Sequence, residues 1–317
     1  MVAEQQVKPP SAGRVKRLIK RIALGLLGII VVVALGGGIW AYAQVSAFDS
    51  SVKKVYDIPL IPVTISSDPA VIARGHHLSK SLAPCALTDC HNDDLAGGRV
   101  VEQGPLGTMQ GPNITSIIAT YSDGELARLI RHGVTKNGNS VIFMPAEEWN
   151  WLPKSDVDAI ISYLRTVKPI DKPSGRPDIH AFGKVLDRLG YIPIDTARRV
   201  AGRKMEIGPE PTPTPEYGKW ISHQCHGCHG EAHMAGGHLD GTPPDFPVPK
   251  NLTPHETGLK GWTFEDFEHM GATGLRKNGE KLAPLMPVEA VNNMDSLEKH
   301  ALWSYLQSLP PVPFGGR

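Results

Sequence analysis

Two cysteine pairs, each followed directly by a histidine, constrain this 317-residue chain more than any other feature. Residues 225–229 read Cys-His-Gly-Cys-His, which is the C-x-x-C-H attachment sequence for c-type haem. Two thiols at this spacing on a helical turn reach the two vinyl groups of one haem, and the next residue is carried under the iron. The pattern therefore predicts covalent attachment at Cys225 and Cys228, with His229 as the proximal iron ligand.

The first pair, Cys85 and Cys90, is followed by His91 but has four residues between its thiols. Because a longer bridge loops out while the thiols and the histidine keep their positions, we expect a second haem here. The predicted cofactors are therefore two covalently bound haem c groups with their iron. A disulfide within each pair and a zinc site shared by both pairs are the alternatives, and neither explains the histidines.

An internal repeat gives the two pairs equivalent places in the chain. Matching residues recur at offsets of 138 to 142, which indicates a duplicated unit of about one hundred residues. Its Asn and Thr positions either hydrogen-bond a haem propionate or stabilise a turn. The matches are Cys90-His91 with Cys228-His229, Asn113-Ile114-Thr115 with Asn251-Leu252-Thr253, Met144-Pro145 with Met286-Pro287, and Tyr163-Leu164 with Tyr305-Leu306.

The readable elements of each copy are helices, so the predicted fold class is all-α. Ser122-x-x-Glu125 and Thr263-x-x-Asp266 are capping-box patterns, and each predicts a helix start. A closing helix is predicted in each copy from apolar residues at i, i+3, i+4 and i+7, with Pro169 and Pro310 ending these helices. The apolar residues are Ile160, Tyr163, Leu164 and Val167 in the first copy, and Leu302, Tyr305, Leu306 and Leu309 in the second.

The predicted organisation has two domains, one for each copy of the repeat. A linker between the copies contains a short helical stretch near Phe182 to Leu189 and a basic run of Arg198, Arg199, Arg203 and Lys204. The predicted segments are a cytoplasmic basic segment (1–21), a transmembrane anchor (22–43), a tether (44–67), the first copy (68–169), the linker (170–212) and the second copy (213–313).

Residues 22–43 contain no charged side chain and follow a segment of net charge +5. At about 1.5 Å per residue this run spans roughly 33 Å, enough to cross a bilayer core. The positive-inside rule keeps the basic segment in the cytoplasm, which predicts a single-pass inner-membrane protein with its haem domains in the periplasm. Because Ala41-Tyr42-Ala43 has the form of a signal-peptidase site, a cleaved signal peptide is the alternative.

A haem iron that carries electrons needs a second axial ligand, and a Met thioether opposite His raises the reduction potential. Met144 and Met286 are the candidates, because each precedes a proline and lies 19 residues before the Tyr-Leu pair of its closing helix. Histidines other than His91 and His229 are expected at the surface. Four other methionines are expected in the core or at the surface, namely Met109, Met234, Met270 and Met294.

With these residues the chain resembles membrane-associated class I c-type cytochromes, specifically the cytochrome subunits of bacterial membrane-bound alcohol, gluconate and aldehyde dehydrogenases. The resemblance covers about residues 68–313 and implies two tandem class I cytochrome c domains. Those subunits typically carry three haems, whereas this chain has two sites, the first with stretched spacing. The resemblance is carried by Arg74-Gly75, Cys225 to His229, Ala96-Gly97-Gly98, Ala235-Gly236-Gly237, the Asn-Ile-Thr and Asn-Leu-Thr triplets and the two Met-Pro pairs.

The expected function is that of a respiratory-chain electron carrier, not an enzyme, that relays single electrons from a periplasmic donor to a membrane or terminal acceptor. The expected partners are a dehydrogenase subunit, a quinone-linked complex or a terminal oxidase, together with the membrane. A net charge of +1 gives no indication of nucleic-acid binding. A dihaem peroxidase with one open haem is the alternative. A membrane-bound redox or gas sensor ranks last, since 21 cytoplasmic residues leave no room for an output domain.

Overall fold

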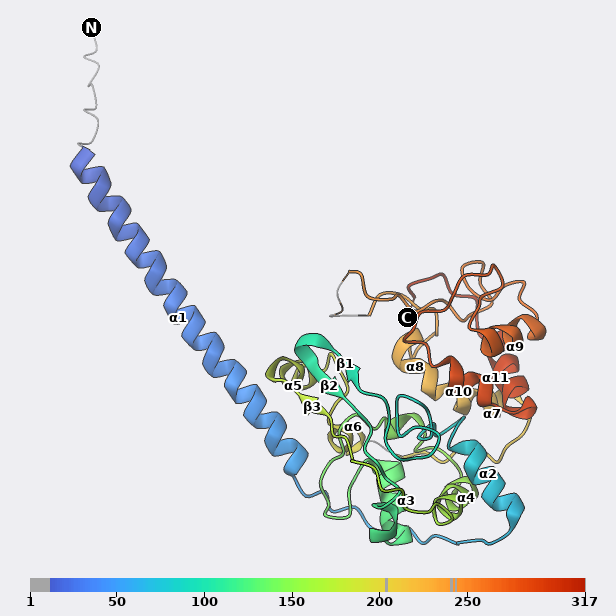
Figure 1. Ribbon diagram of the computed structural model, residues 1–317. Coiled ribbons are helices and arrows are strands. Elements are labelled where there is room, and N and C mark those ends of the chain that lie inside the picture. The colour runs from blue at the N-terminus through green and yellow to red at the C-terminus, as the bar shows by residue number, and fades with distance from the viewer. Residues whose placement is uncertain (1–11, 203–204, 240–241, 243, 317) are drawn as a thin grey trace. The chain divides into compact units, whose positions relative to one another are not determined.

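The computed structural model describes residues 12–202, 205–239, 242 and 244–316. Residues 1–11 of the predicted cytoplasmic segment, and Arg203 and Lys204 of the basic run, lie outside the described residues. The chain divides into two compact units, Met1–Ala47 and Phe48–Arg317, and the second contains both copies of the repeat. Helices are the main elements, as the sequence predicts (Figure 1).

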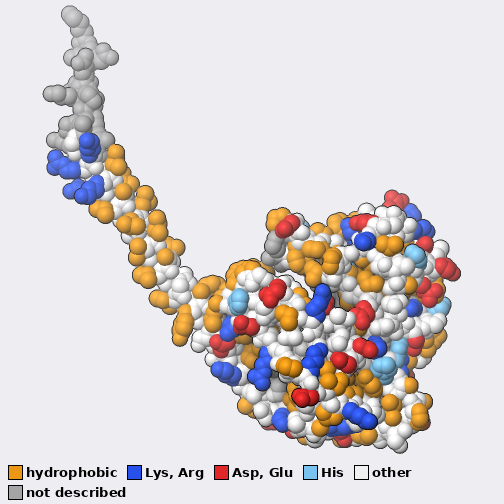
Figure 2. Space-filling view, in the orientation of Figure 1, with side chains coloured by type: hydrophobic (Ala, Val, Ile, Leu, Met, Phe, Trp, Pro, Cys, Tyr) orange, Lys and Arg blue, Asp and Glu red, His pale blue; other side chains and the backbone are white. Residues whose placement is uncertain are grey.

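The long apolar run lies in the first helix, α1 (Ala12–Lys53), which exposes orange apolar side chains along its length (Figure 2). Its stretch Ile19–Lys53 is long and apolar enough to cross a membrane, and the most apolar 18-residue window in it has a mean hydropathy of 2.6. Because a signal sequence passes the same test, this finding agrees with both interpretations of the sequence. The helix continues into the predicted tether, where Phe48 is 2% exposed.

Helix α3 (Asp123–His132) in the first copy and α9 (Phe264–Thr273) in the second begin as the sequence predicts. In both, the N-cap hydroxyl accepts a hydrogen bond from the backbone three residues later, and that residue's carboxylate accepts one in return. Both helices end at a glycine with positive φ, Gly133 at 63° and Gly274 at 68°, a conformation that favours glycine. The two capping-box predictions are therefore confirmed.

The first and last helices of each copy also correspond, although other elements between them differ. Helix α2 packs on α4, and α7 packs on α11, so the first helix of each copy lies against its last. In the first copy the elements are α2 (Pro69–Leu78), β1 (Val101–Glu102), η1 (Gly104–Leu106), β2 (Gly107–Met109), η2 (Ile118–Thr120), η3 (Ala146–Glu148) and α4 (Lys154–Leu164). In the second they are α7 (Pro215–Ile221), α8 (His223–His229), α10 (Val288–Asn293) and α11 (Ser296–Ser308).

Some details differ from the sequence expectation. The inclusion of Val167 and Leu309 in the closing helices is wrong, because α4 ends at Leu164 and α11 ends at Ser308. The backbone N–H of each donates to the carbonyl three residues earlier, in a tighter turn. A small antiparallel sheet, β1-β2-β3, also lies in this otherwise helical unit, with β3 at Asp178–Ile179. Strands of two or three residues are too short to show an alternating pattern in the sequence.

The segment between the copies is folded against the first copy. It contains β3, which pairs with β2, then α5 (Ala181–Arg188) and α6 (Thr196–Val200). Helix α5 matches the short helix that the sequence predicts near Phe182 to Leu189. Helix α6 contacts both η3 and α3. This segment therefore packs against the first copy near η3, which follows Met144 in the chain.

Candidate functional site

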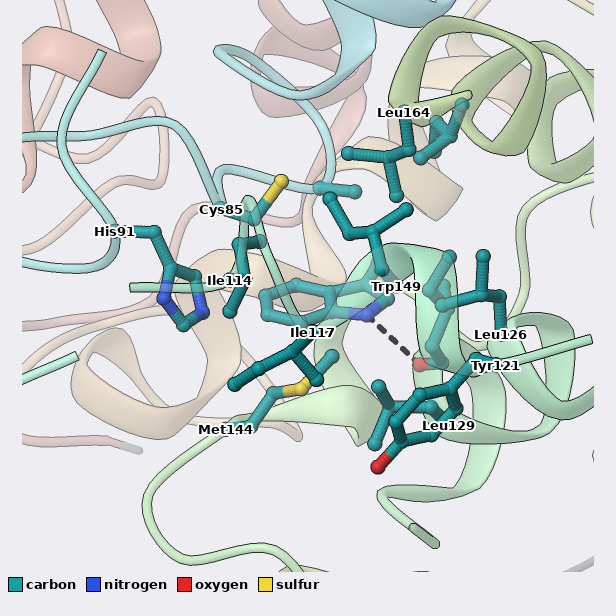
Figure 3. A pocket seen from close by; sticks show the side chains of 14 residues that line it. Cys85, His91, Ile114, Ile117, Tyr121, Leu126, Leu129, Met144, Trp149 and Leu164 are labelled. Atoms are coloured by element: carbon teal, nitrogen blue, oxygen red, sulfur yellow. Dashed lines mark hydrogen bonds between the residues drawn. The ribbon is translucent and has the colours of Figure 1, made fainter. Parts of the chain in front are cut away.

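A pocket in the first copy brings together three of the predicted site residues. Cys85, His91 and Met144 all line it, and apolar side chains from η2, α3 and α4 form most of the remaining wall (Figure 3). Trp149 closes one side and is fixed by a 3.0 Å hydrogen bond from its indole N–H to the Ile130 carbonyl. The first copy thus places a thiol, an imidazole and a thioether around one apolar space.

The longer Cys85 to Cys90 bridge folds as a chain of turns. The backbone N–H of Cys90 donates to the Leu87 carbonyl at 3.0 Å, and that of His91 donates to the Cys85 carbonyl at 3.0 Å. Leu87 is 7% exposed, so one of the additional residues fills the core. The Arg99 N–H also donates to the Thr88 carbonyl at 3.0 Å. The four-residue bridge therefore has a defined conformation that holds Cys85 and His91 close together.

The second copy carries its thiols on a helix. Cys225, Cys228 and His229 all belong to α8, where the sequence predicts a helical turn. Cys225 and Met286 both pack against the main hydrophobic cluster, and His229 is 7% exposed. The second copy thus carries the predicted residues of this site on α8 and just before α10.

Both predicted iron-binding histidines are oriented by the same contact. His91 Nδ1 donates to the Pro112 carbonyl at 2.8 Å, and His229 Nδ1 donates to the Lys250 carbonyl at 2.7 Å, in each case 21 residues along the chain. A metal-bound histidine commonly fixes its second ring nitrogen in this way, which leaves Nε2 to bind the metal. Burial also lowers the pKa of His91 and so favours the neutral ring that a metal requires.

The surroundings of Cys85 and Cys225 favour the protonated thiol over the thiolate. Burial raises the pKa of both Cys85 and Cys225 to about 12, and the Glu148 carboxylate adds to the effect at Cys225. Zinc binds thiolates, which these surroundings disfavour. The described residues contain one group of three close metal-binding side chains, His77 with Asp295 and Glu298, and no cysteine belongs to it. The donor set of each copy, with its apolar surroundings, therefore fits haem c better than zinc.

In each copy, the asparagine of the repeat hydrogen-bonds to the segment that follows the last helix. Asn113 donates to the Ile170 and Lys172 carbonyls, both at 3.0 Å, and Asn251 donates to the Val312 carbonyl at 2.7 Å. Each also accepts the hydroxyl of the threonine two residues later. These side chains are engaged by the protein itself, which favours the turn role over a propionate contact.

The remaining methionines and histidines divide between core and surface. Met234 and Met294 are buried at 1% and 3% exposure, as core residues. His223 differs from the surface expectation, because its ring lies 5.0 Å from the ring of Trp220 and 6.3 Å from that of Trp151. Burial lowers the pKa of His223 to about 4, so it is neutral at neutral pH.

An ion network that no sequence motif indicates joins the two copies. Arg74 donates to Asp156 in its own copy at 3.1 Å and to Glu298 in the other copy at 2.8 Å. His77 also contacts Glu298 at 2.8 Å, and Glu298 has no exposed surface. Arg74 and His77 each lie more than 200 residues from Glu298 in the sequence, and no motif links them to it.

Comparison with known proteins gives the family context. The chain is 24% identical over 285 residues to the fructose dehydrogenase cytochrome subunit of Gluconobacter japonicus, which covers 82% of this chain and 57% of the relative. It is 26% identical over 287 residues to the cytochrome c subunit of the quinone alcohol dehydrogenase of Gluconacetobacter polyoxogenes, covering 79% and 58%. The chain resembles dehydrogenase cytochrome c subunits. No family model matches it.

A shorter match points the same way. Over 90 residues, or 28% of this chain and 20% of the relative, it is 31% identical to the gluconate 2-dehydrogenase cytochrome c subunit of Pantoea cypripedii. The resemblance expected from the motifs is thus confirmed, and the names of these relatives agree with an electron carrier rather than an enzyme. The chain spans less than 60% of the length of the fructose and alcohol dehydrogenase relatives.

Proposed function

We propose that this chain is a membrane-anchored dihaem cytochrome c that relays single electrons from a periplasmic dehydrogenase to a membrane or terminal acceptor. It comprises two tandem class I cytochrome c domains, residues 68–169 and 213–313. The first holds one haem c through Cys85 and Cys90 with His91 and Met144 as ligands. The second holds the other through Cys225 and Cys228 with His229 and Met286.

One observation carries the proposal, namely the repeated orientation of His91 and His229 by a carbonyl 21 residues later. A metal-binding histidine commonly has one ring nitrogen fixed by a carbonyl, which orients the ring toward the metal. Together with the C-x-x-C-H sequence of α8, this favours the same cofactor in both copies. Haem c held in this way supplies a one-electron iron couple.

The protein residues have three tasks. The cysteines would retain the group covalently, and the histidine and methionine of each copy would bind its iron. In the first copy the apolar wall that includes Trp149 and Ile130 would exclude water. A Met ligand opposite His favours electron exchange over substrate binding, because it closes the sixth position. The chain therefore acts by holding its cofactors and bringing them close to partner proteins.

The membrane part of the proposal uses α1 as an uncleaved single-pass anchor in the inner membrane. Its apolar run is longer than the core of a usual signal peptide, and the basic residues before it favour a cytoplasmic N-terminus. Trp40 and Tyr42 stand at the far end of the run, where aromatic residues commonly lie at a membrane surface. Both haem domains then lie in the periplasm.

The intact denatured mass tests the proposal. The full-length protein is expressed with a haem-maturation system and extracted from membranes. The expected mass is that of the whole chain plus two haems, and Cys225→Ala combined with Cys228→Ala should remove one haem. A wild-type mass with one haem would overturn the dihaem assignment, and a mass that begins near Gln44 would replace the anchor with a cleaved signal peptide.

A further inference from the structure

The loop that carries Met144 is paired along its length with the segment between the copies. Ile142 and Asp195 form an antiparallel bridge, and the Phe143 N–H donates to the Ile194 carbonyl at 2.9 Å. The Thr196 hydroxyl donates to the carbonyl of Met144 itself at 2.7 Å. Residues 194–197 are all buried, so water does not compete with these bonds.

Phe143 shows why such support is needed. Its φ is +65°, in the left-handed region that an aromatic residue rarely occupies. A backbone in this conformation persists only where its surroundings determine it. The hydrogen bond to Ile194 holds Phe143 from one side, and the contact of Thr196 with Met144 holds the next residue. The unfavourable conformation sets the position from which the Met144 side chain enters the pocket.

The paired segment is itself fixed by buried charges. Asp187 has no exposed surface, and its carboxylate accepts hydrogen bonds from the backbone of Ile194 at 2.9 Å and of Asp195 at 3.0 Å. Arg198 forms an ion pair with Asp187 at 2.7 Å. The Ala197 N–H also donates to the Ser140 hydroxyl at 2.9 Å. The segment is therefore rigid enough to support the Met144 loop.

The second copy has the same hairpin without this support. The bridge between Val134 and Ser140 recurs between Leu275 and Lys281, so the two hairpins correspond. Leu285, which precedes Met286 as Phe143 precedes Met144, is 55% exposed. Among the described residues, no hydrogen bond joins residues 279–285 to a segment outside their own hairpin. The Met286 loop thus faces solvent where the Met144 loop is covered.

We infer that residues 194–197 are a brace that positions Met144 as an iron ligand, and that Met286, which lacks a brace, is the exchangeable ligand. This inference rests on the proposed function, since it needs a haem in each copy. Thr196 is a positioning residue, because it acts through the Met144 backbone. The consequence is a division of roles: the first site keeps its two axial ligands, and the second opens its sixth position to a competing ligand.

A titration of the oxidised two-haem protein with imidazole tests this. As the imidazole concentration rises, the weak absorption band of the Met–Fe(III) bond should disappear in two equal steps. The imidazole concentrations of the two steps should differ by about tenfold or more, because several hydrogen bonds support only one of the two loops. Met286→His supplies a tethered imidazole and should abolish the first step, whereas Met144→His should abolish the second. The opposite assignment, or one common step, would overturn the inference.

Thr196 is tested by removing its hydroxyl while keeping its shape. Thr196→Val should move the second step to an imidazole concentration lower by roughly threefold to tenfold, the value of one hydrogen bond, and leave the first step in place. Thr196→Ser keeps the hydroxyl and should titrate as the wild type does. Thr166→Val is the matched control, because it removes a hydroxyl that donates to the Tyr163 carbonyl at 2.7 Å in an exposed turn after α4.

The outcomes separate the brace from the proposed function. Fewer than two haems in the intact mass would refute the dihaem function, and the brace with it. Two haems with equal imidazole sensitivity would leave the function standing and refute the brace alone. A Thr196→Val protein in which both steps move together would also count against it, because a general loss of stability affects both sites.

Discussion

Gly75 of α2 crosses Ala159 of α4 so closely that a β-carbon on the glycine would stand 2.0 Å from the Ala159 carbonyl oxygen. The second copy repeats this relationship, with Gly218 of α7 at the same 2.0 Å from the Ala301 carbonyl oxygen of α11. In both copies the close neighbour is backbone, which cannot rotate away as a side chain does. The first and last helices of each copy therefore meet at a point where only glycine fits.

Alanine at either glycine should destabilise its copy. Gly75→Ala and Gly218→Ala each force two helices apart, and such overpacking costs about 1–3 kcal/mol even though alanine favours the helix itself. Urea unfolding of the haem-loaded protein, followed by circular dichroism, measures the loss. Ala73→Ser, at an exposed position of α2, is the control and should change stability by less than about 0.5 kcal/mol. Equal stability of both glycine variants and the control would contradict the close crossing.

The parts of the fold that the sequence predicts are those whose contacts join residues close together in the chain. The capping boxes at Ser122 and Thr263 are made by residues three apart, so the sequence contains both partners of each contact. The Met144 loop is different, because its brace lies about 50 residues away and includes no motif. Ile194 and Thr196 are ordinary residues until the fold brings them against the loop. The candidate ligands were therefore predictable, and the difference between the two sites was not.

Removing Arg74 should weaken the contact between the copies. Arg74→Met removes the cation that pairs with Asp156 and Glu298, whose side chains are 5% and 0% exposed, and leaves His77 as the remaining partner of Glu298. Breaking a buried ion pair from one side costs about 3–5 kcal/mol, because a charge stays buried without compensation. Urea unfolding near pH 7 measures this loss.

The control for Arg74 is an exposed pair in the first copy. Arg99 and Asp89 form an ion pair at 2.8 Å with side chains 65% and 57% exposed. Arg99→Met should therefore cost far less stability than Arg74→Met. If the Arg74 and Arg99 variants lost equal stability, the network between the copies would be no stronger than a surface ion pair.

On the proposed function, loss of either Met144 or Met286 should change one haem only. Met144→Ala and Met286→Ala would each remove one thioether ligand, and this loss lowers the reduction potential of the haem concerned. A spectroelectrochemical titration should then show one shifted and one unchanged component. Met234→Ala, in the core of the second copy, is the control and should leave both potentials in place. Peroxide turnover by the wild type, with both methionines present, would instead favour the peroxidase alternative.

Glu148 should make stability depend on pH in the neutral range. Burial raises the pKa of Glu148 to about 7 from an ordinary value of 4.5. Between these values the folded protein binds a proton that the unfolded chain has released, so the free energy of unfolding falls as pH rises from about 4.5 to about 7. Glu148→Gln stays neutral throughout and should lose this dependence, which makes the variant more stable than the wild type at pH 8.

The measurement is urea unfolding of both proteins at several pH values from 5 to 8, and the stability difference between them is the quantity of interest. It should grow in favour of Glu148→Gln as pH rises and level off above about pH 7. Glu289→Gln is the matched control, since Glu289 is an exposed carboxylate just after Met286. A difference that is constant with pH would mean that Glu148 is already ionised at pH 5, in contact with water or a cation.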